Sequence, residues 1–229
     1  MEQHSIKVIA RIRSDFQTKF GIPRQSGLVD ALRAAVVFEP EFRNPDALRG
    51  IEGFSHLWLI WQFSEAVRED WSPTVRPPRL GGNARMGVFA TRSPFRPNAL
   101  GLSCVRLEGV EQTAEGPVLL VASADLMDGT PIYDIKPYLP YADCRPDAAG
   151  GFAPQRGAEL AVRIPGALLA RVPEDKRAAL TGVLAQDPRP RYQDDPARLY
   201  GMRFAGLEVR FRVVDGVVHV VELMKERGS

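Results

Sequence analysis

The ten residues FSHLWLIWQF at Phe54–Phe63 indicate the fold class of this chain most directly. The run is too apolar for a surface helix and is rich in aromatic and branched side chains, so we interpret it as a buried strand. Shorter runs on both sides are also predicted strands, separated by loops that contain glycine and proline. These runs are Ser5–Arg13, Ala35–Phe38, Gly87–Thr91, Leu102–Leu107, Pro117–Ala124 and Ile132–Ile135. Many strands without a good helix between them are typical of an all-β barrel or sandwich.

The last third of the chain has a different pattern. It follows Tyr141–Gly157, a segment rich in glycine, proline and alanine that we interpret as a domain boundary or long linker. Pro173–Asp175 is a typical helix start, and an apolar stripe at helical spacing predicts a helix that ends before Asp187. Farther on, Asp215–Gly216 separates two alternating apolar runs and predicts a type I′ β-hairpin. We therefore expect a small α+β unit here.

The composition is that of an ordinary globular protein. The chain has 229 residues and a mass of 25.3 kDa, with 45% apolar and 25% charged residues, which excludes a disordered or fibrous protein. No apolar run approaches the roughly 18–20 residues of a membrane span. The N-terminal residues MEQHSIKVIARIRS contain no apolar signal-peptide core, so we expect a cytoplasmic protein.

Several common cofactor and catalytic motifs are missing from the sequence. It contains no GxGxxG after a strand, no GxxxxGK[ST] and no GxSxG, which argues against a Rossmann fold, a P-loop and a typical serine hydrolase. The cysteines Cys104 and Cys144 are far apart, and the three histidines His4, His56 and His219 are scattered. We therefore expect neither a disulfide framework nor a metal site.

The charges are unevenly distributed although the net charge is only +2. The segment Trp71–Leu107 contains six arginines and no Asp, Glu or Lys. Such a segment produces a local positive potential that attracts phosphate groups. The alternative is a genome-wide preference for arginine, because the chain has 25 Arg and 5 Lys. That preference explains the residue type but does not explain the missing acids, so we favour a functional basic surface.

Most of the candidate binding residues lie in loops. In Trp71–Ser103, glycine and proline exclude regular structure over much of the segment, whereas its large apolar side chains predict an ordered loop packed on a sheet. The alternative is a rigid loop that only closes a barrel. The loop GIPRQSG at Gly21–Gly27 could be a plain surface turn, and Ser123–Asp134 pairs two carboxylates that could accept hydrogen bonds or simply form a turn. Gln186–Tyr192 combines arginines with an aromatic ring, as in nucleobase-binding sites.

Five of these motifs together resemble the TsaA-like family, whose bacterial members are the TrmO-type tRNA (adenine-N6)-methyltransferases. They occur in order through most of the chain, from about residue 6 to about residue 215, and the longest is highly specific. The motifs are PRQ at Pro23–Gln25, FSHLW at Phe54–Trp58, RPPRLGGNARMGVFATRSPFRPN at Arg76–Asn98, DGTPIYDIKPYLP at Asp128–Pro140 and QDPRPRY at Gln186–Tyr192.

The resemblance implies a mainly β fold, with a small N-terminal β-barrel that binds S-adenosylmethionine and is not a Rossmann fold. On this basis we divide the chain into a barrel domain, residues 1–145, and a small α+β C-terminal domain, residues 146–229. It also implies a homodimer and methyl transfer to N6 of threonylcarbamoyl-adenosine at position 37 of threonine tRNA. An alternative is an enzyme or sensor that uses S-adenosylmethionine but acts on a small molecule other than tRNA.

The resemblance also implies site residues, position by position. The expected cofactor contacts are Pro23, Arg24, Gln25, Ser64, Glu65, Arg92, Leu102, Asp125, Leu126, Met127 and Asp128. Relatives carry His-Gln at the place of Ser64 and Glu65, which makes these two the weakest assignments. A carboxylate suits the ribose diol and the ammonium group of this cofactor, and an arginine suits its carboxylate.

For tRNA we expect contacts from arginines and aromatic residues. The expected tRNA-binding residues are Arg79, Arg85, Arg96, Lys136, Tyr138, Arg189, Arg191 and Tyr192. The last three come from the C-terminal domain, and the domain of the partner subunit is the alternative source. The reacting nitrogen must lose a proton, but no residue in the sequence identifies itself as the base, because Asp125 and Asp128 are both assigned to the cofactor.

Overall fold

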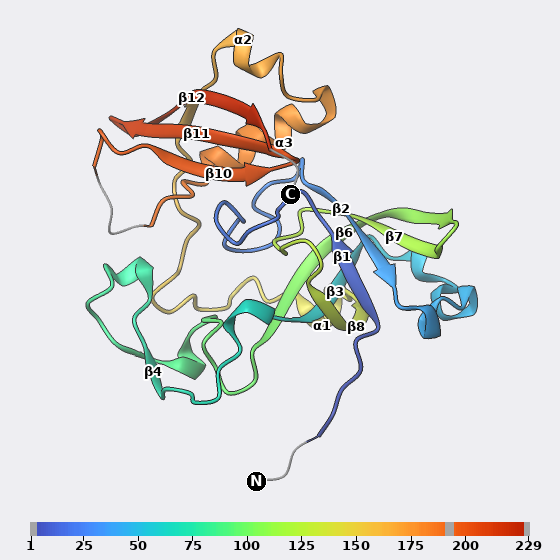
Figure 1. The fold of residues 1–229 in the computed structure, drawn as a ribbon. Helices are drawn as coiled ribbons and strands as arrows, with labels where there is room; N and C mark the ends of the chain where they lie inside the picture. The colour runs from blue at the N-terminus through green and yellow to red at the C-terminus, as the bar shows by residue number, and fades with distance from the viewer. Residues whose placement is uncertain (1–3, 191–194, 227–229) are drawn as a thin grey trace.

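A computed structural model of the chain describes residues 4–190 and 195–226. It is mainly β, as the sequence predicts, with two larger sheets and a two-stranded ribbon. Figure 1 shows the C-terminal sheet, in orange and red, above the barrel, and a long excursion around β4 to one side. In the part of the chain that is described, no helix is long and apolar enough to cross a membrane.

The first sheet is a barrel with the strand order β1-β2-β7-β6-β3-β8. The ring closes unevenly, because β8 pairs with β1 through only two residue pairs, Ala10 with Ile132 and Arg11 with Pro131. The strands are β1 (Ala10–Arg13), β2 (Arg33–Phe38), β3 (His56–Gln62), β6 (Leu100–Thr113), β7 (Gly116–Ala122) and β8 (Pro131–Pro137).

Alternation along the strands places every second side chain in the barrel core. In β3, for example, Leu57, Leu59 and Trp61 are buried while their neighbours are half-buried. The interior is filled in this way by side chains from all parts of the ring. The predicted strand positions are confirmed for β2, β3, β7 and β8, and β6 is longer than predicted. The predicted strand Ser5–Arg13 is wrong in its first half, because β1 begins only at Ala10.

The segment between β3 and β6 is mostly irregular. It contains only β4 (Thr74–Val75) and β5 (Met86–Gly87), which pair with each other. The predicted strand Gly87–Thr91 is wrong, because Val88–Ala90 is a 3₁₀ turn. The Thr91 hydroxyl and amide both donate to the Val88 carbonyl, and this closes the turn. Three further 3₁₀ turns precede β3, at Pro40–Phe42, Pro45–Leu48 and Ile51–Gly53. One follows β3 directly, at Ser64–Ala66, and one lies between β4 and β5, at Pro78–Leu80.

The C-terminal region has a four-stranded sheet of order β10-β11-β12-β9. Its helix α3 (Glu174–Ala185) begins and ends close to the predicted positions. The predicted hairpin is confirmed, because Asp215 and Gly216 both have the positive φ that a type I′ turn requires, 49° and 72°. The remaining elements are α1 (Pro140–Asp143), β9 (Ala161–Arg163), α2 (Gly166–Leu169), β10 (Tyr200–Phe204), β11 (Leu207–Val214) and β12 (Val217–Lys225).

The loop after β1, residues 14–32, packs into the core of the C-terminal region. Phe16 makes an edge-on contact with Phe204 of β10, with 5.4 Å between ring centres. Val29 lies against α3 at Gly182, where an added Cβ would come within 2.6 Å of a Val29 methyl group. Asp15 forms a 2.7 Å ion pair with Lys176 of the same helix. The C-terminal region therefore supports the loop that carries the Pro23–Gln25 motif.

Candidate functional site

One large cavity, of about 920 Å³, opens at the rim of the barrel. We name two of its sides. The strand wall consists of Trp61, Gly101, Leu102, Asp125, Met127 and Thr130, from β3, β6 and the loop between β7 and β8. The arginine-loop wall consists of Phe89, Arg92, Pro94, Phe95, Arg96, Pro97 and Asn98, from the acid-free segment.

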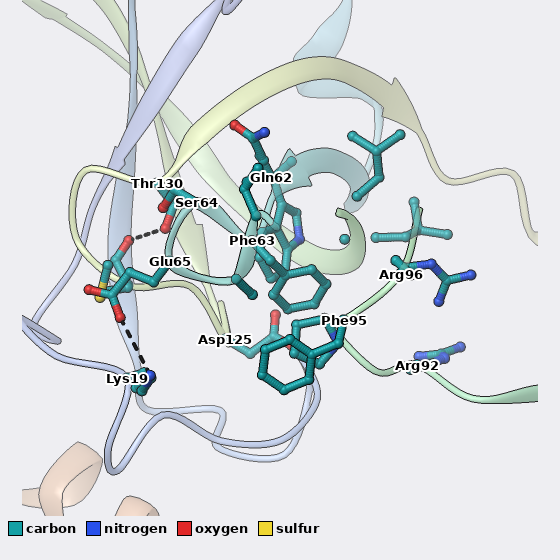
Figure 2. A pocket seen from close by; sticks show the side chains of 18 of the residues that line it. Lys19, Gln62, Phe63, Ser64, Glu65, Arg92, Phe95, Arg96, Asp125 and Thr130 are labelled. Atoms are coloured by element: carbon teal, nitrogen blue, oxygen red, sulfur yellow. Dashed lines mark hydrogen bonds and ion pairs between the residues drawn. The ribbon is translucent and has the colours of Figure 1, made fainter. Parts of the chain in front are cut away.

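In the view of Figure 2, Phe63 and Phe95 are drawn close to Asp125, and Arg92 and Arg96 lie to one side of them. Residues 61–68 and the loop after β1 complete the cavity. Four segments that are distant in the sequence therefore meet at one place, residues 19–25, 61–68, 89–102 and 125–130.

Asp125 is the buried acid of the strand wall. The Ser103 hydroxyl donates to its Oδ1 over 2.6 Å, and the Trp61 indole N–H donates to Ser103 Oγ over 2.9 Å. Gly101 pairs with Trp61 across the strands, and an added Cβ at Gly101 would lie 2.3 Å from the indole ring. The glycine is therefore what allows the indole to lie flat against β6.

The environment of Asp125 makes it a weak acid. Burial raises its pKa to about 6, because removal from water disfavours the carboxylate. Hydrogen bonds from Ser103 and from two backbone amides, together with the positive charge of Arg92, act in the opposite direction. Near neutral pH the group is thus mostly ionised, yet it exchanges its proton in the physiological range. Such a perturbed acid in a cavity is typical of a functional site.

The loop after β1 brings the PRQ motif to the cavity. Pro23, Arg24 and Gln25 all line it, and the Gln25 side chain accepts a hydrogen bond from Arg92. Gly21, with φ of 98°, allows the chain to turn against Met202 of β10. The structure therefore brings the two distant motifs around Gln25 and Arg92 into contact.

The turn after β3 forms another side of the cavity. Ser64 and Glu65 line it, as expected from the resemblance, and Glu65 lies 4.0 Å from the ammonium group of Lys19. Phe63 packs edge-on against Trp61, with 4.3 Å between ring centres. This turn therefore contributes both an exposed ion pair and an apolar surface.

The arginine-loop wall is more exposed than the sequence suggests. Phe89 and Phe95 are 73% and 42% exposed, and Trp71 is 53% exposed, so these side chains do not pack the loop onto a sheet as expected. The guanidinium of Arg68 lies over the Phe95 ring at 4.0 Å from its centre. Six further residues line the cavity although no sequence motif gives them a site role, namely Lys19, Phe63, Arg68, Phe89, Phe95 and Thr130.

Two expected cofactor residues do not line the cavity. Leu126 is buried in the barrel core, and the Asp128 carboxylate accepts a 2.9 Å hydrogen bond from the Ser14 amide. Their neighbours Asp125 and Met127 do line it. The alternation is that of an extended segment, whose successive side chains point to opposite sides.

The expected tRNA-binding residues are distributed over several places. Arg96 lines the cavity, whereas Arg79 and Arg85 lie elsewhere in the same segment. Lys136 is at the end of β8 and pairs with Asp134, and the ring of Tyr138 lies 5.8 Å from that of Trp58. These two residues are not among those that line the cavity.

The loop after α3 lies against the cofactor motif. The guanidinium of Arg189 makes two hydrogen bonds to the Asp187 carboxylate, of 2.8 and 3.0 Å. The Arg189 carbonyl accepts a 3.3 Å hydrogen bond from Arg24, so the QDPRPRY and PRQ motifs are neighbours within one chain. Arg191 and Tyr192 lie outside the described residues. Among the residues that are described, no group of three His, Cys, Asp or Glu side chains is placed to hold a metal ion.

Comparison with known proteins identifies the family. The family models for the N-terminal domain of tRNA-methyltransferase O and for the TrmO C-terminal domain match residues 11–144 and 158–226. The chain is 43% identical to the tRNA (adenine(37)-N6)-methyltransferase of Escherichia coli K12, over 97% of this chain and 99% of the relative.

A second relative and a solved structure agree with this result. A Pseudomonas aeruginosa protein named as a putative S-adenosylmethionine-dependent methyltransferase is 44% identical over 91% of this chain and 92% of its own length. The crystal structure of TrmO from Pseudomonas aeruginosa is similar with a TM-score of 0.80 and 35% identity, over 97% of this chain and 99% of that one. By its family models, its relatives and its fold, the chain belongs to the TrmO family of tRNA methyltransferases.

Proposed function

We propose that this protein transfers a methyl group from S-adenosylmethionine to N6 of threonylcarbamoyl-adenosine at position 37 of threonine tRNA. The general activity, S-adenosylmethionine-dependent methylation of adenine 37 in tRNA, is the one for which the relatives are named. The threonylcarbamoyl group and the choice of threonine tRNA go beyond those names and rest on the resemblance in the motifs.

The observation that carries the proposal is the pairing of Asp125 with Arg92 across one cavity. Its volume of about 920 Å³ lies within the range of small-molecule sites. Asp125 suits hydroxyl or ammonium donors, Arg92 suits a carboxylate, and Phe63 and Leu102 offer apolar surface for a purine ring. The residues present therefore fit S-adenosylmethionine, which carries all four kinds of group.

Nine of the eleven expected cofactor residues line this cavity, and we retain them as the proposed contacts. They are Pro23, Arg24, Gln25, Ser64, Glu65, Arg92, Leu102, Asp125 and Met127. For Leu126 and Asp128 a direct contact remains a prediction from the resemblance alone, since their side chains are engaged elsewhere.

The chemistry of the site is mainly a matter of alignment. When bound, S-adenosylmethionine supplies a methyl group on a positively charged sulfur, which a nucleophile takes up in line with the bond that breaks. The protein holds the two reactants in contact, and such positioning supplies about 7–11 kcal/mol of the barrier in well-oriented reactions. The adenine N6 nitrogen loses its proton in the same reaction.

We assign tRNA binding to the arginine-loop wall and its surroundings. Arg96 lies at the cavity, and Arg79 and Arg85 continue the positive charge along the same segment. The exposed ring of Phe89 offers a stacking surface for an unpaired base of the anticodon loop. Arg189 contributes through its contact with Arg24, because its guanidinium is held by Asp187.

Several further statements remain predictions. They are tRNA contacts by Lys136, Tyr138, Arg191 and Tyr192, the division into domains at residues 145 and 146, the homodimer and the cytoplasmic location. In the described structure Arg24 and Arg189 meet within a single chain, so contact between the two motifs does not require a partner subunit.

The proposed function is tested by nucleoside mass spectrometry of threonine tRNA from a strain that lacks the gene, beside its parent. We expect the methylated threonylcarbamoyl-adenosine to disappear and the unmethylated form to accumulate, with restoration by the wild-type gene. Complementation with an Asp125→Asn variant of equal expression should fail. Identical nucleoside profiles in both strains would contradict the proposal and favour a small-molecule acceptor.

A further inference from the structure

A chain of hydrogen bonds links three side chains, two of which, Trp61 and Asp125, belong to the strand wall, with Ser103 buried between them. Trp61 is 6% exposed and Ser103 is 1% exposed. The indole N–H donates to Ser103 Oγ over 2.9 Å, and the Ser103 hydroxyl donates to Asp125 Oδ1 over 2.6 Å. Trp61 and Ser103 lie diagonally across β3 and β6, and no sequence motif gives either of them a site role.

The hydrogen positions in this chain follow from the chemistry of its members. An indole nitrogen only donates, so Ser103 Oγ is the acceptor in the first bond. The hydroxyl proton of Ser103 then needs an acceptor of its own, because an unsatisfied buried hydroxyl is costly. Among the hydrogen bonds of the described residues, Asp125 Oδ1 is its one acceptor. Both bonds therefore point toward Asp125.

This direction gives the two oxygens of Asp125 different tasks. Oδ1 accepts the hydroxyl proton and cannot at the same time carry a proton directed at Ser103. Proton uptake and ligand contact therefore fall to the other oxygen, Oδ2. The packing makes the arrangement rigid, since Gly101 leaves just enough space for the indole and Phe63 lies against its edge.

We propose that Trp61 and Ser103 are positioning residues, which hold Asp125 with Oδ1 as a fixed acceptor and present Oδ2 to the cofactor as an ionised hydrogen-bond acceptor. The cofactor part of this inference rests on the proposed function, whereas the hydrogen-bond chain is a property of the protein alone. A second consequence is that cofactor affinity decreases when Asp125 becomes protonated.

Most of the charged groups that share the cavity with Asp125 are cationic. Arg92 is the charged side chain that acts on its pKa, and it favours the ionised form. Lys19, Arg24, Glu65, Arg68 and Arg96 also line the cavity. Because burial raises the pKa of Asp125 to about 6, protonation occurs in a pH range where the fold can be studied.

The hydrogen-bond chain is tested without cofactor, by following the indole N–H resonances of the free protein in two-dimensional ¹⁵N NMR between pH 4.5 and 8. We expect the Trp61 signal, assigned by its absence in Trp61→Phe, to titrate with a midpoint of about pH 6. The titration should vanish in Asp125→Asn and in Ser103→Ala and should persist in Ser103→Thr, which keeps the hydroxyl. A Trp61 signal that does not titrate in the wild type would overturn the proposal.

The effect on the cofactor is tested by calorimetry with S-adenosylhomocysteine at pH 6 and pH 8. Loss of the Ser103 hydrogen bond should raise the midpoint for Asp125 by about one pH unit. The ratio of the Ser103→Ala to the wild-type Kd should then be about fivefold at pH 6 and approach one at pH 8. Ser103→Thr should restore the wild-type ratio, and Trp58→Phe, on the outer face of the same strand, should change nothing at either pH.

The possible outcomes separate the two proposals. If the wild type does not bind S-adenosylhomocysteine at all, the proposed function is wrong, whereas the NMR titration still tests the hydrogen-bond chain. If Ser103→Ala weakens binding equally at both pH values, Ser103 acts through packing alone and the positioning role is wrong. The same conclusion follows if affinity increases as the pH falls, because Asp125 would then bind in its protonated form.

Discussion

The two walls of the cavity differ in how the fold holds them. The strand wall is made of residues from two barrel strands and from the short loop between β7 and β8. Hydrogen bonds between side chains hold it in place, as in the Trp61–Ser103–Asp125 chain. The arginine-loop wall has little regular structure, and two of its aromatic rings, Phe89 and Phe95, face solvent. A rigid wall suits a small cofactor of fixed structure, whereas an exposed basic wall suits a large polyanion such as tRNA.

This difference leads to a division of function. Changes in the strand wall should affect stability and cofactor affinity. Changes in the arginine-loop wall should affect tRNA affinity, except at Arg92, which is assigned to the cofactor. A substitution in one wall that changes the affinity for the ligand assigned to the other wall would contradict this division.

The largest effect is expected from Gly101→Ala in the strand wall. The new Cβ would lie 2.3 Å from the Trp61 ring, so strand and indole must move apart. We expect a loss of about 3 kcal/mol in the free energy of unfolding, from urea denaturation, because overpacking of a tight core has costs of this size. Gly109→Ala in the same strand is the matched control, since nothing lies within 4 Å of its Cβ position. Equal effects of the two substitutions would contradict the prediction.

The next effect is expected from Asp125→Asn. We expect cofactor affinity to fall about 100-fold, because a charge-assisted hydrogen bond and its orientation are lost. Stability should change in the other direction. Since the pKa of Asp125 is raised from 3.8 to about 6, its neutral form favours folding below pH 4 and this contribution is lost as the pH rises through 6.

The same variant therefore has a pH signature. Asparagine cannot ionise, so at pH 8 the variant should be more stable than the wild type by about 2–3 kcal/mol, and at pH 4 the two should be equal. Thermal unfolding at the two pH values measures this difference. A variant that is less stable than the wild type at pH 8 would show that the Asp125 carboxylate stabilises the fold.

Phe89→Ala tests the arginine-loop wall. The ring is 73% exposed, so its removal should cost little stability and should leave cofactor affinity unchanged. We expect tRNA affinity to fall about tenfold in filter binding, in the range for loss of one base-stacking contact. The nearby Trp71→Ala, whose ring lies 6.1 Å from that of Phe89 but does not line the cavity, shows whether any exposed ring has the same effect. Loss of cofactor binding in Phe89→Ala would contradict the assignment of the arginine-loop wall to tRNA.

The smallest effect is expected from Arg85→Gln. Arg85 has no hydrogen bond or ion pair with another described residue, so its charge is available to a phosphate. We expect about a threefold loss of tRNA affinity at moderate salt and a decrease of about one in the slope of log K against log salt concentration. Arg43→Gln, whose guanidinium donates to the Phe38 carbonyl on the barrel, is a charge-matched control. An unchanged salt slope would remove Arg85 from the tRNA surface.

The sequence predicts the strands, the helix α3 and the hairpin well, because each depends on a local pattern. Period-2 alternation identifies β11 and β12, and the Asp215–Gly216 turn needs only its own two residues. The error at Gly87–Thr91 has a nonlocal cause. The Val88 amide donates a 3.0 Å hydrogen bond to the carbonyl of Pro73, which lies fifteen residues earlier in the sequence. No local pattern reports such a contact.

The candidate site is predictable in its motifs but not in its geometry. The motifs identify Gln25, Arg92 and Asp125, yet their meeting depends on loops that close over long distances in the sequence. Alternation explains afterwards why Asp125 faces the cavity and Leu126 does not, but the sequence does not tell which of the two is turned inward. The exposure of Phe89 cannot be predicted from the sequence either, because an apolar residue in a loop is found both in packed and in exposed binding positions.

The central claim is that this cavity transfers a methyl group from its cofactor to adenine 37 of tRNA. It is tested most directly by incubating the purified protein with S-adenosylmethionine labelled in the methyl group and with threonine tRNA that carries the threonylcarbamoyl modification. We predict label on N6 of the modified adenosine at position 37 after nuclease digestion, and none with the Asp125→Asn variant. Cofactor binding by the wild type without any label in the tRNA would contradict the account.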